Sequence, residues 1–242
     1  MVQFDIITLF PAMFQSPLQE SILKRAQQRG LVSIHIHDLR DYTEDKHRTA
    51  DDTPYGGGAG MVMKVEPIVK ALDAVAGTGA QVLRLLTSPQ GRVFDQQTAW
   101  RYRSCERIVL VCGRYEGVDE RVLSYVDEEV SVGDFILTGG ELAAMVIVDA
   151  VSRLVPGVVG DEASVKEDTF ENGLLKFPQY TRPQTFRSQS VPEVLVSGNH
   201  GKVRMWRKMQ ALLKTFQRRP DLIEKADLSD EDRKLLDTNK QI

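Results

Sequence analysis

Apolar runs of strand length alternate with helix-like segments through the first half of this chain. That alternation is typical of an α/β domain with a largely parallel sheet, because each helix returns the chain to the start of the next strand. Continuous apolar runs predict strands at residues 4–10, 81–86 and 107–112. Over residues 32–36, Val and Ile alternate with Ser and His, and this period of two predicts a half-buried strand.

Helix signals flank several of these strands. Ser16, Pro17 and Gln19 are typical of an N-cap, a first turn and a capping box, and Gly30 is a stop signal, so we expect a helix over residues 17–29. Residues 140–155 are rich in Ala, Val, Met and Leu and predict a mostly buried helix. The Pro, Gly and acids that follow lack an apolar period, which indicates a linker and a domain boundary. We therefore expect a domain at residues 1–158, a linker at 159–172 and a smaller, mostly helical domain at 173–242.

The composition is that of an ordinary globular protein, with 42% hydrophobic and 27% charged residues. No run approaches the roughly 18 apolar residues of a spanning helix, and the N-terminus lacks a basic region followed by a cleavable apolar segment. We therefore expect no membrane partner and a cytoplasmic location. Cys105 and Cys112 are the only cysteines, and the apolar run around Cys112 favours a buried, inert thiol over a disulfide or a zinc site.

The net charge of −3 conceals a strongly basic segment. Residues 182–219 contain nine Lys or Arg and a single acid, a local charge of +8. On a helix, one side of this segment would be apolar (Met205, Trp206, Met209, Leu212, Leu213, Phe216) and the other basic (Arg204, Arg207, Lys208, Arg218). The basic side is either an ordinary solvated surface or a patch for nucleic-acid phosphates.

Glycine-containing loops follow three of the apparent strands, at residues 87–91, 113–117 and 133–140. Ligands of open α/β sheets bind beyond the carboxyl ends of the strands, so these loops form a candidate cofactor site, with purely structural turns as the alternative. The glycine run at residues 55–60 follows a charged segment instead of a strand, and no Gly-Lys-Ser/Thr comes after it. It is therefore neither a dinucleotide fingerprint nor a P-loop.

Asp168 and Arg153 are inconspicuous on chemical grounds alone. Asp168 lies among other acids and is compatible with a solvated linker, and Arg153 near the end of an apolar helix could pair with an acid or extend to solvent. His47 and His200 show no metal-ligand spacing. The residues by themselves indicate no catalytic group.

Seven ordered segments nevertheless resemble one family over nearly the whole chain. They are DKHRTADDTPYGGGAGM, LTSPQGRVFDQ, LVCGRYEGVDERV, VGDFILTGGEL, VSRLVPGVVGDEAS with EDTF, FPQYTRP and VLVSGNHGKVRMWR. Together they are similar to the bacterial tRNA (guanine-N1)-methyltransferases. The resemblance implies methyl transfer from S-adenosylmethionine to N1 of guanosine 37 of tRNA, beside the anticodon. It also implies a homodimer with a composite active site, and an α/β SPOUT-type sheet with a deep C-terminal trefoil knot, a feature that is rare among folds.

The resemblance also implies site residues. Cofactor contacts are expected from the three loops, at Leu86, Ser88, Pro89, Gly113, Tyr115, Glu116, Val132, Gly133, Asp134, Phe135, Ile136, Leu137, Gly139 and Gly140. Asp168 matches the base that removes the N1 proton, and Arg153 matches the donor that stabilises the negative charge on O6. The family is associated with Mg²⁺, for which Glu116 is a candidate. Ala143 and Phe135 replace a proline and a tyrosine that are common in the family, which affects the shape of the pocket.

Contacts to tRNA are expected at two places, the 47–52 loop and the basic helix. The candidate residues are His47, Arg48, Asp51, Lys202, Arg204, Arg207 and Lys208. Two alternatives remain at this point: another SPOUT enzyme, such as a ribose 2′-O-methyltransferase, or a non-enzymatic RNA-binding module. Stabilisation by S-adenosylmethionine would separate an enzyme from such a module.

Overall fold

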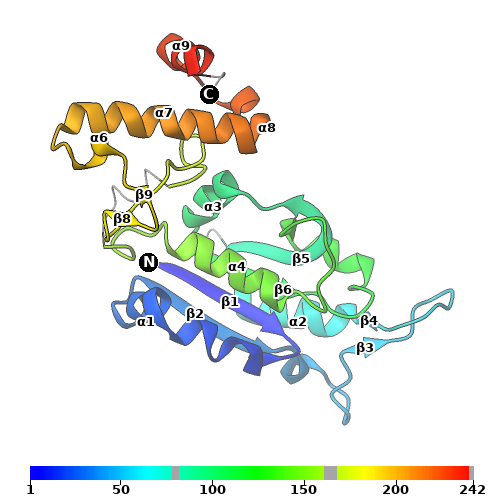
Figure 1. Ribbon diagram of the computed structural model, residues 1–242. Helices are drawn as coiled ribbons and strands as arrows, with labels where there is room; N and C mark the ends of the chain where they lie inside the picture. Colours follow the sequence, from blue (N-terminus) through cyan, green and yellow to red (C-terminus); the bar gives the residue numbers. More distant parts are fainter. Residues whose placement is uncertain (78–81, 161–167, 240–242) are drawn as a thin grey trace. The chain divides into compact units, whose positions relative to one another are not determined.

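The computed structural model describes residues 1–77, 82–160 and 168–239 of the chain. It divides into two compact units, Met1–Gly160 and Asp161–Ile242. The first unit contains a parallel sheet of strand order β2-β1-β6-β5-β7 (Figure 1). Its strands are β1 (Val2–Thr8), β2 (Val32–Asp38), β5 (Val82–Val93), β6 (Arg107–Cys112) and β7 (Glu128–Ser131). The predicted α/β class with a parallel sheet is confirmed.

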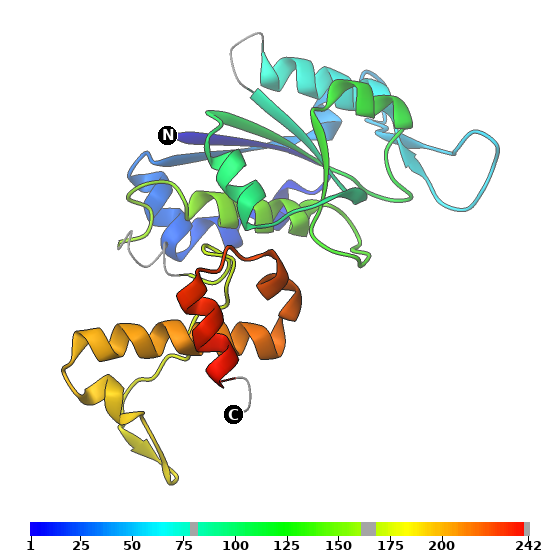
Figure 2. The same ribbon diagram turned by 90° about the horizontal axis from the view of Figure 1, so that it is seen from above.

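Helices cover both faces of this sheet. Helix α2 (Val65–Ala76) packs on one face, and α1 (Ser21–Gln28), α3 (Gln96–Arg103) and α4 (Glu141–Ser152) lie on the other (Figure 2). The central strands β1 and β6 are covered on both sides, so nearly every residue of both is buried. Short 3₁₀ turns connect the elements at Pro11–Phe14, Pro17–Gln19, Leu39–Tyr42 and Glu120–Tyr125.

The sequence predicts most of these elements, with shifted ends. Strand β6 has the predicted bounds, β2 is half-buried as its alternation indicates, and α4 is confirmed as a mostly buried helix. Strand β1 lies two residues earlier than predicted. Gln81, the first residue of the predicted 81–86 strand, lies outside the described residues.

The helix predicted at residues 17–29 begins later than its capping signals indicate. Ser16 has a helical backbone and makes no side-chain cap, so the first turn is an isolated 3₁₀ turn, Pro17–Gln19. Glu20 is then extended, and α1 starts at Ser21. The predicted stop is confirmed: Gly30 has a φ of +65°, and the Leu31 N–H donates to the Ala26 carbonyl at 3.0 Å.

Strand β5 is longer than predicted because it includes the first glycine-containing loop. Its pairing with β7 is interrupted between Thr87 and Arg92, so residues 88–91 form a bulge in the strand. This bulge replaces the free loop that we expected after the strand. The β3 (Asp51–Asp52) and β4 (Val62–Met63) hairpin projects from the same unit and carries the 55–60 glycine run (Figure 1).

The second unit is mostly helical where it is described. It contains the hairpin β8 (Thr185–Phe186) and β9 (Gln189–Ser190), and the helices α6 (Glu193–Val196), α7 (His200–Arg218), α8 (Pro220–Lys225) and α9 (Asp230–Asn239). The Asn199 side chain caps α7 by accepting from the Lys202 N–H at 3.0 Å. Buried Thr215 anchors a preceding segment, because its hydroxyl accepts from the Leu175 N–H at 2.9 Å. Residues 161–167 of the predicted linker lie outside the described residues.

The predicted division of α7 into an apolar and a basic side is partly wrong. Met205, expected to pack, is 46% exposed. Arg207, expected to face solvent, is half-buried with its guanidinium 4.8 Å from the centre of the Phe177 ring. Periodicity predicts which residues share one side of a helix. Which side is covered depends on the neighbouring chain, here the non-helical segment at residues 177–182.

Candidate active site

A cavity in the first unit lies beside the bulge within β5 and the end of β7. Its lining comes from the bulge, the third loop and the start of α4: Thr87, Ser88, Pro89, Val130, Ser131, Val132, Gly133, Phe135, Leu137, Gly139, Gly140 and Ala143. Eight of the residues that we expected to contact the cofactor are in this lining. The cavity volume is about 50 Å³, whereas sites for small molecules have roughly 300–1,000 Å³. A cofactor-sized ligand must therefore also occupy the adjoining surface or displace the third loop, which exposes Asp134, Phe135 and Ile136.

The backbone around this cavity is packed too closely for larger residues. The Gly140 N–H donates to the Gly113 carbonyl at 2.8 Å, which joins the second loop to the third. A Cβ atom on Gly140 would overlap the Thr87 side chain, and one on Gly139 would overlap the Arg114 side chain. The two glycines are thus required by the close approach of neighbouring side chains, and Leu86, also expected at the site, is buried in β5 just before Thr87.

A buried ion pair links the third loop to the start of α4. The Arg114 N–H donates from Nε to Glu141 Oε1 at 3.1 Å, and Nε lies 2.9 Å from Oε2. Glu141 is fully buried at the start of α4 and also accepts from the Thr8 hydroxyl at 2.8 Å. Arg114 Nη1 donates to the Thr138 carbonyl at 3.0 Å, so the same guanidinium holds both the helix and the loop.

The contacts among Thr8, Arg114 and Glu141 were not predicted from the sequence. Thr8, Arg114 and Glu141 come from three distant parts of the chain, and each has an ordinary polar interpretation by itself. The one available signal was Glu141, a carboxylate at the start of a segment that is otherwise mostly apolar and buried. A buried carboxylate requires a cationic or hydrogen-bonding partner, and Arg114 is that partner.

The second loop faces the glycine run instead of the cavity. Tyr115 has a φ of +59°, a backbone conformation that residues other than glycine rarely adopt, and its ring is half exposed. The Glu116 N–H donates to the Met61 carbonyl at 3.1 Å, and the Glu116 carboxylate lies against Gly60. Tyr115 and Glu116 therefore border the 55–60 run, outside the lining of the cavity.

The candidate RNA loop at residues 47–52 is held by its own polar contacts. Asp45 accepts from the His47 and Thr49 backbone N–H groups at 2.9 Å each, and these hydrogen bonds lower the pKa of its carboxyl. Arg48 forms an ion pair with Asp41, and Asp51 pairs with Met63 in the β3–β4 hairpin. Within residues 1–77, 82–160 and 168–239, no group of three or more His, Cys, Asp and Glu side chains is arranged to hold a metal ion.

A second cavity, of about 350 Å³, lies in the second unit and contains Asp168. The residues that line it are Asp168, Asn172, Leu174, Leu175, Lys176, Phe177, Arg204, Arg207, Lys208, Ala211, Asp227, Leu228 and Asp232. The Asp168 Oδ1 atom is 3.0 Å from Lys176 Nζ, and both side chains are about three-quarters buried. Asp168, which local sequence patterns would assign to a solvated linker, thus lies in a cavity whose lining has four basic and three acidic residues.

Three of the expected RNA contacts share this cavity with Asp168, namely Arg204, Arg207 and Lys208. Lys208 Nζ is 2.7 Å from Asp232 of α9, and this contact raises the pKa of Lys208. Lys202 lies apart from them, exposed in the first turn of α7. Lys176 was not predicted as a site residue, because the basic segment in the sequence begins at residue 182.

Arg153 belongs to the first unit and follows the last turn of α4. Its backbone N–H donates to the Asp149 carbonyl at 3.1 Å, and the residue is half-buried. Its position at the helix C-terminus is favourable for a cation, because the helix dipole is negative there. Asp168 and Arg153 are thus provided by different units of the chain.

A sequence profile of the family described as tRNA (Guanine-1)-methyltransferase TrmD matches residues 2–225. The chain belongs to this family. A relative from Dictyoglomus turgidum, named tRNA (guanine-N(1)-)-methyltransferase, is 54% identical over 241 residues, covering 100% of this chain and 98% of the relative. One of the same name from Citrifermentans bemidjiense is 55% identical, covering 97% of this chain and 94% of the relative. Membership of the tRNA (guanine-1)-methyltransferase family confirms the resemblance inferred from the motifs.

Among the described residues, no helix of this family member has the length and apolar character needed to cross a bilayer.

Proposed function

We propose that this chain transfers the methyl group of S-adenosylmethionine to N1 of the guanosine at position 37 of tRNA. The observation that carries the proposal is the family match over residues 2–225, which includes the loop cavity and, in the Asp168 cavity, Asp168 itself with most of the lining. Relatives at about 55% identity and nearly full coverage carry the name of the same reaction. The structure adds which side chains are available for each part of that reaction.

The loop cavity fits the methyl donor. Its lining is largely backbone and apolar side chains, which suits the adenine and ribose of a nucleoside cofactor, and Gly139 and Gly140 keep the backbone close to whatever binds there. Ser88, Pro89 and the 132–140 loop would hold the cofactor. Leu86 and Gly113 adjoin this lining, and Tyr115 and Glu116 would contact the cofactor only where it extends beyond the cavity. When bound, S-adenosylmethionine supplies an electrophilic methyl group.

Asp168 would act on the nucleophile. N1 of guanine carries a proton, so removal of this proton by a carboxylate makes the nitrogen nucleophilic, and general-base help of this kind is worth about 10²–10⁴-fold. Loss of the proton leaves negative charge on O6, which the Arg153 guanidinium would stabilise as a charged donor. Lys176, 3.0 Å from the carboxylate, favours its ionised form, the one that can accept a proton.

Glu116 is the residue available for Mg²⁺. Its carboxylate lies beside Gly60, and magnesium is usually bound by one or two carboxylates together with waters or substrate oxygens. Glu116 would hold the ion in that way, and no step of the proposed reaction is routed through it.

We also propose the assembly and the finer topology that the family resemblance implies, a homodimer with a composite active site and a trefoil knot. Leu142 and Val146 support a dimer, because they lie four residues apart on one side of α4 and are 47% and 50% exposed. An apolar strip of this kind on a helix of the first unit is suited to cover by a second copy. Because we propose a tRNA substrate, we also propose a cytoplasmic location.

The experiment is nucleoside analysis of a tRNA transcript after incubation with S-adenosylmethionine. We expect 1-methylguanosine, and none with a transcript in which adenosine replaces guanosine 37. Asp168→Asn should lose methyl transfer while retaining cofactor affinity, and Glu193→Gln, an exposed acid of the same unit, should behave as wild type. A 2′-O-methylated product would contradict N1 transfer, and near-wild-type single-turnover transfer by Asp168→Asn would remove it as the base.

A further inference from the structure

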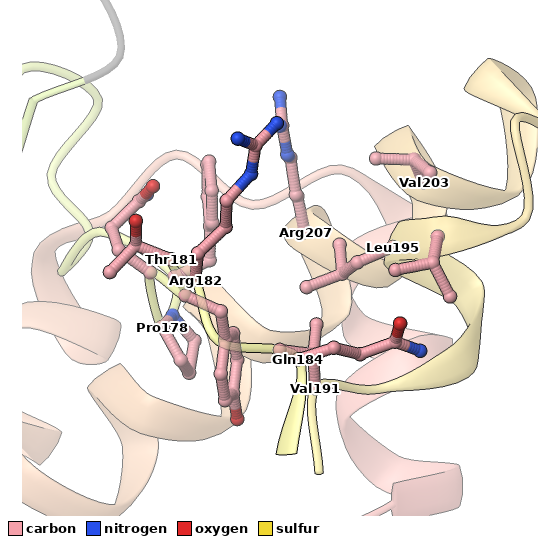
Figure 3. A pocket seen from close by; sticks show the side chains of 12 residues that line it. Pro178, Thr181, Arg182, Gln184, Val191, Leu195, Val203 and Arg207 are labelled. Atoms are coloured by element: carbon pink, nitrogen blue, oxygen red, sulfur yellow. The ribbon is translucent and has the colours of Figure 1, made fainter. Parts of the chain in front are cut away.

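A separate pocket of about 500 Å³ opens beside the β8–β9 hairpin of the second unit (Figure 3). Its lining comes from the segment before the hairpin, from α6 and from α7: Phe177, Pro178, Gln179, Tyr180, Thr181, Arg182, Gln184, Val191, Leu195, Val196, Val203 and Arg207. The volume is in the usual range of sites for small ligands. Two of the seven motifs, FPQYTRP and VLVSGNHGKVRMWR, contribute to this lining, but the proposed chemistry does not use the pocket, which shares Phe177 and Arg207 with the Asp168 cavity.

Two guanidinium groups give the pocket an uncompensated positive charge. Figure 3 shows the side chains of Arg182 and Arg207 extending in the same direction from the lining. Of the described residues that line the pocket, none is acidic, and no carboxylate in the described part of the chain lies within 4.0 Å of either guanidinium. Two like charges in the lining of one pocket favour an anionic ligand there.

Arg207 is also short of a hydrogen-bond partner. Its Nε atom is buried from solvent and, among the described residues, has no acceptor. The guanidinium stacks 4.8 Å from the centre of the Phe177 ring, which orients it without satisfying its N–H groups. A buried donor without an acceptor is unfavourable, so a ligand that supplies an acceptor gains affinity from it.

The rest of the lining is apolar with a few polar groups. Val191, Leu195 and Val203 form an apolar wall, drawn on the other side of the pocket from Arg182 in Figure 3. Thr181 and Gln184 add a hydroxyl and an amide. Charged arginines beside an apolar wall match a nucleotide, because its phosphate is anionic and its base presents a flat apolar face.

We propose that this pocket binds one unpaired nucleotide of the RNA substrate, with its phosphate between Arg182 and Arg207 and its base against the wall of Val191, Leu195 and Val203. The proposal rests on the proposed function for the presence of an RNA substrate. A nucleotide of a paired stem is excluded by the geometry of recognition, since the face of its base is covered by neighbours in the stack. The bound nucleotide is distinct from the guanosine that is methylated.

The phosphate contact is tested with Arg182→Gln in the full-length protein. Fluorescence anisotropy with a labelled anticodon-arm RNA would give the Kd over a series of KCl concentrations. We expect about a tenfold higher Kd, because one charge-assisted contact is lost, and a salt slope smaller by about 0.7, the value for one phosphate of a single strand. The matched control is Arg219→Gln, whose guanidinium already pairs with Asp221 at 2.7 Å, and its slope should change less.

The base contact is tested by combining an abasic RNA with a wall variant. Removal of one unpaired base of the anticodon arm should weaken wild-type binding about fivefold or more, as loss of one stacked base does. In Leu195→Ser the same abasic substitution should have little further effect, because protein and RNA changes remove the same contact. S-adenosylmethionine affinity, which depends on the other unit, should be unchanged in both variants. The far-UV circular dichroism of the full-length protein, unchanged from wild type, would report that the helices of the second unit are folded.

The outcomes separate the pocket from the reaction. A wild-type Kd and salt slope in Arg182→Gln, with 1-methylguanosine still formed, would overturn the pocket and leave the proposed function in place. Strictly additive effects of the abasic RNA and Leu195→Ser would likewise overturn it. Raised melting temperature with free GMP, lost in Arg182→Gln while RNA affinity is unchanged, would identify a mononucleotide site and also overturn it. Absence of methylated guanosine with the wild-type protein would defeat the proposed function on its own.

Discussion

The ion pair between Arg114 and Glu141 gives the sharpest quantitative prediction. Glu141→Leu would leave the Arg114 guanidinium without its carboxylate in a site where the arginine side chain is only 14% exposed. Breaking a buried pair on one side costs about 3–5 kcal/mol in unfolding free energy, and the small remaining exposure of Arg114 points to the lower end. Replacement of both residues, as Arg114→Met with Glu141→Leu, should cost far less than the two single changes together, because no buried charge remains unpaired.

Urea denaturation of the four proteins of this cycle measures that difference. Isothermal titration with S-adenosylmethionine adds a second readout, because Arg114 also donates to the Thr138 carbonyl of the third loop. We expect about a tenfold loss of cofactor affinity in Arg114→Met, since the loop loses the contact that preorganises it. The control is Glu44→Gln at the exposed pair of Glu44 with Lys70, which should leave the unfolding free energy nearly unchanged.

Two results would refute this reasoning. One is a Glu141→Leu protein less than about 1 kcal/mol below wild type, which would mean that water or other groups satisfy Arg114. The other is a double variant whose loss equals the sum of the single losses, since this would show that the two side chains act independently.

Three further predictions concern other parts of the first unit. Burial raises the pKa of Asp5, but hydrogen bonds from His37, Arg107 and Gln3 outweigh burial and hold the pKa at about 2. The ionised carboxylate therefore adds about 2 kcal/mol to the unfolding free energy above pH 4, and this contribution is lost as the pH falls from 4 to 2. Urea denaturation at each pH should show the gap between wild type and Asp5→Asn closing over that range. Gly140→Ala should weaken S-adenosylmethionine binding about tenfold or more by pushing on Thr87, and Thr87→Ala in the same chain should restore part of it. Burial, and then the charge of Glu141, raise the pKa of Cys112 well above its ordinary value, so a thiol reagent should label Cys105 first and Cys112 only on unfolding, as mass spectrometry of digests would report.

Local sequence patterns predict the sheet better than the site. Strand β6 and the half-buried β2 follow from apolar runs and alternation, because both depend on which face of a strand is covered. Capping signals misplaced the start of α1 because the extended backbone of Glu20 separates Ser16 from the helix. The bulge within β5 depends on its pairing with β7, which no local pattern contains.

Strand order and charge predicted the three loops and the basic helix as candidate sites, but individual site residues were predicted only through the ordered motifs. Those motifs indicated eight of the residues around the loop cavity, and they selected Asp168, which the local pattern would assign to solvent. The positions of Arg114 and Lys176 in the sites were not predicted, because their partners, Glu141 and Asp168, come near them only in the folded chain.

Arg207 and Phe177 form a wall common to the Asp168 cavity and the hairpin pocket. The Arg207 guanidinium cannot lie close to both cavities at once. An anion that draws it toward the hairpin pocket would therefore withdraw positive charge from the Asp168 cavity. Because positive charge near a carboxylate favours its ionised form, we expect occupancy of the pocket and the protonation of Asp168 to be linked. In Arg207→Gln the pH dependence of methyl transfer should no longer respond to removal of the bound base, whereas an undiminished response would show that the two cavities are independent.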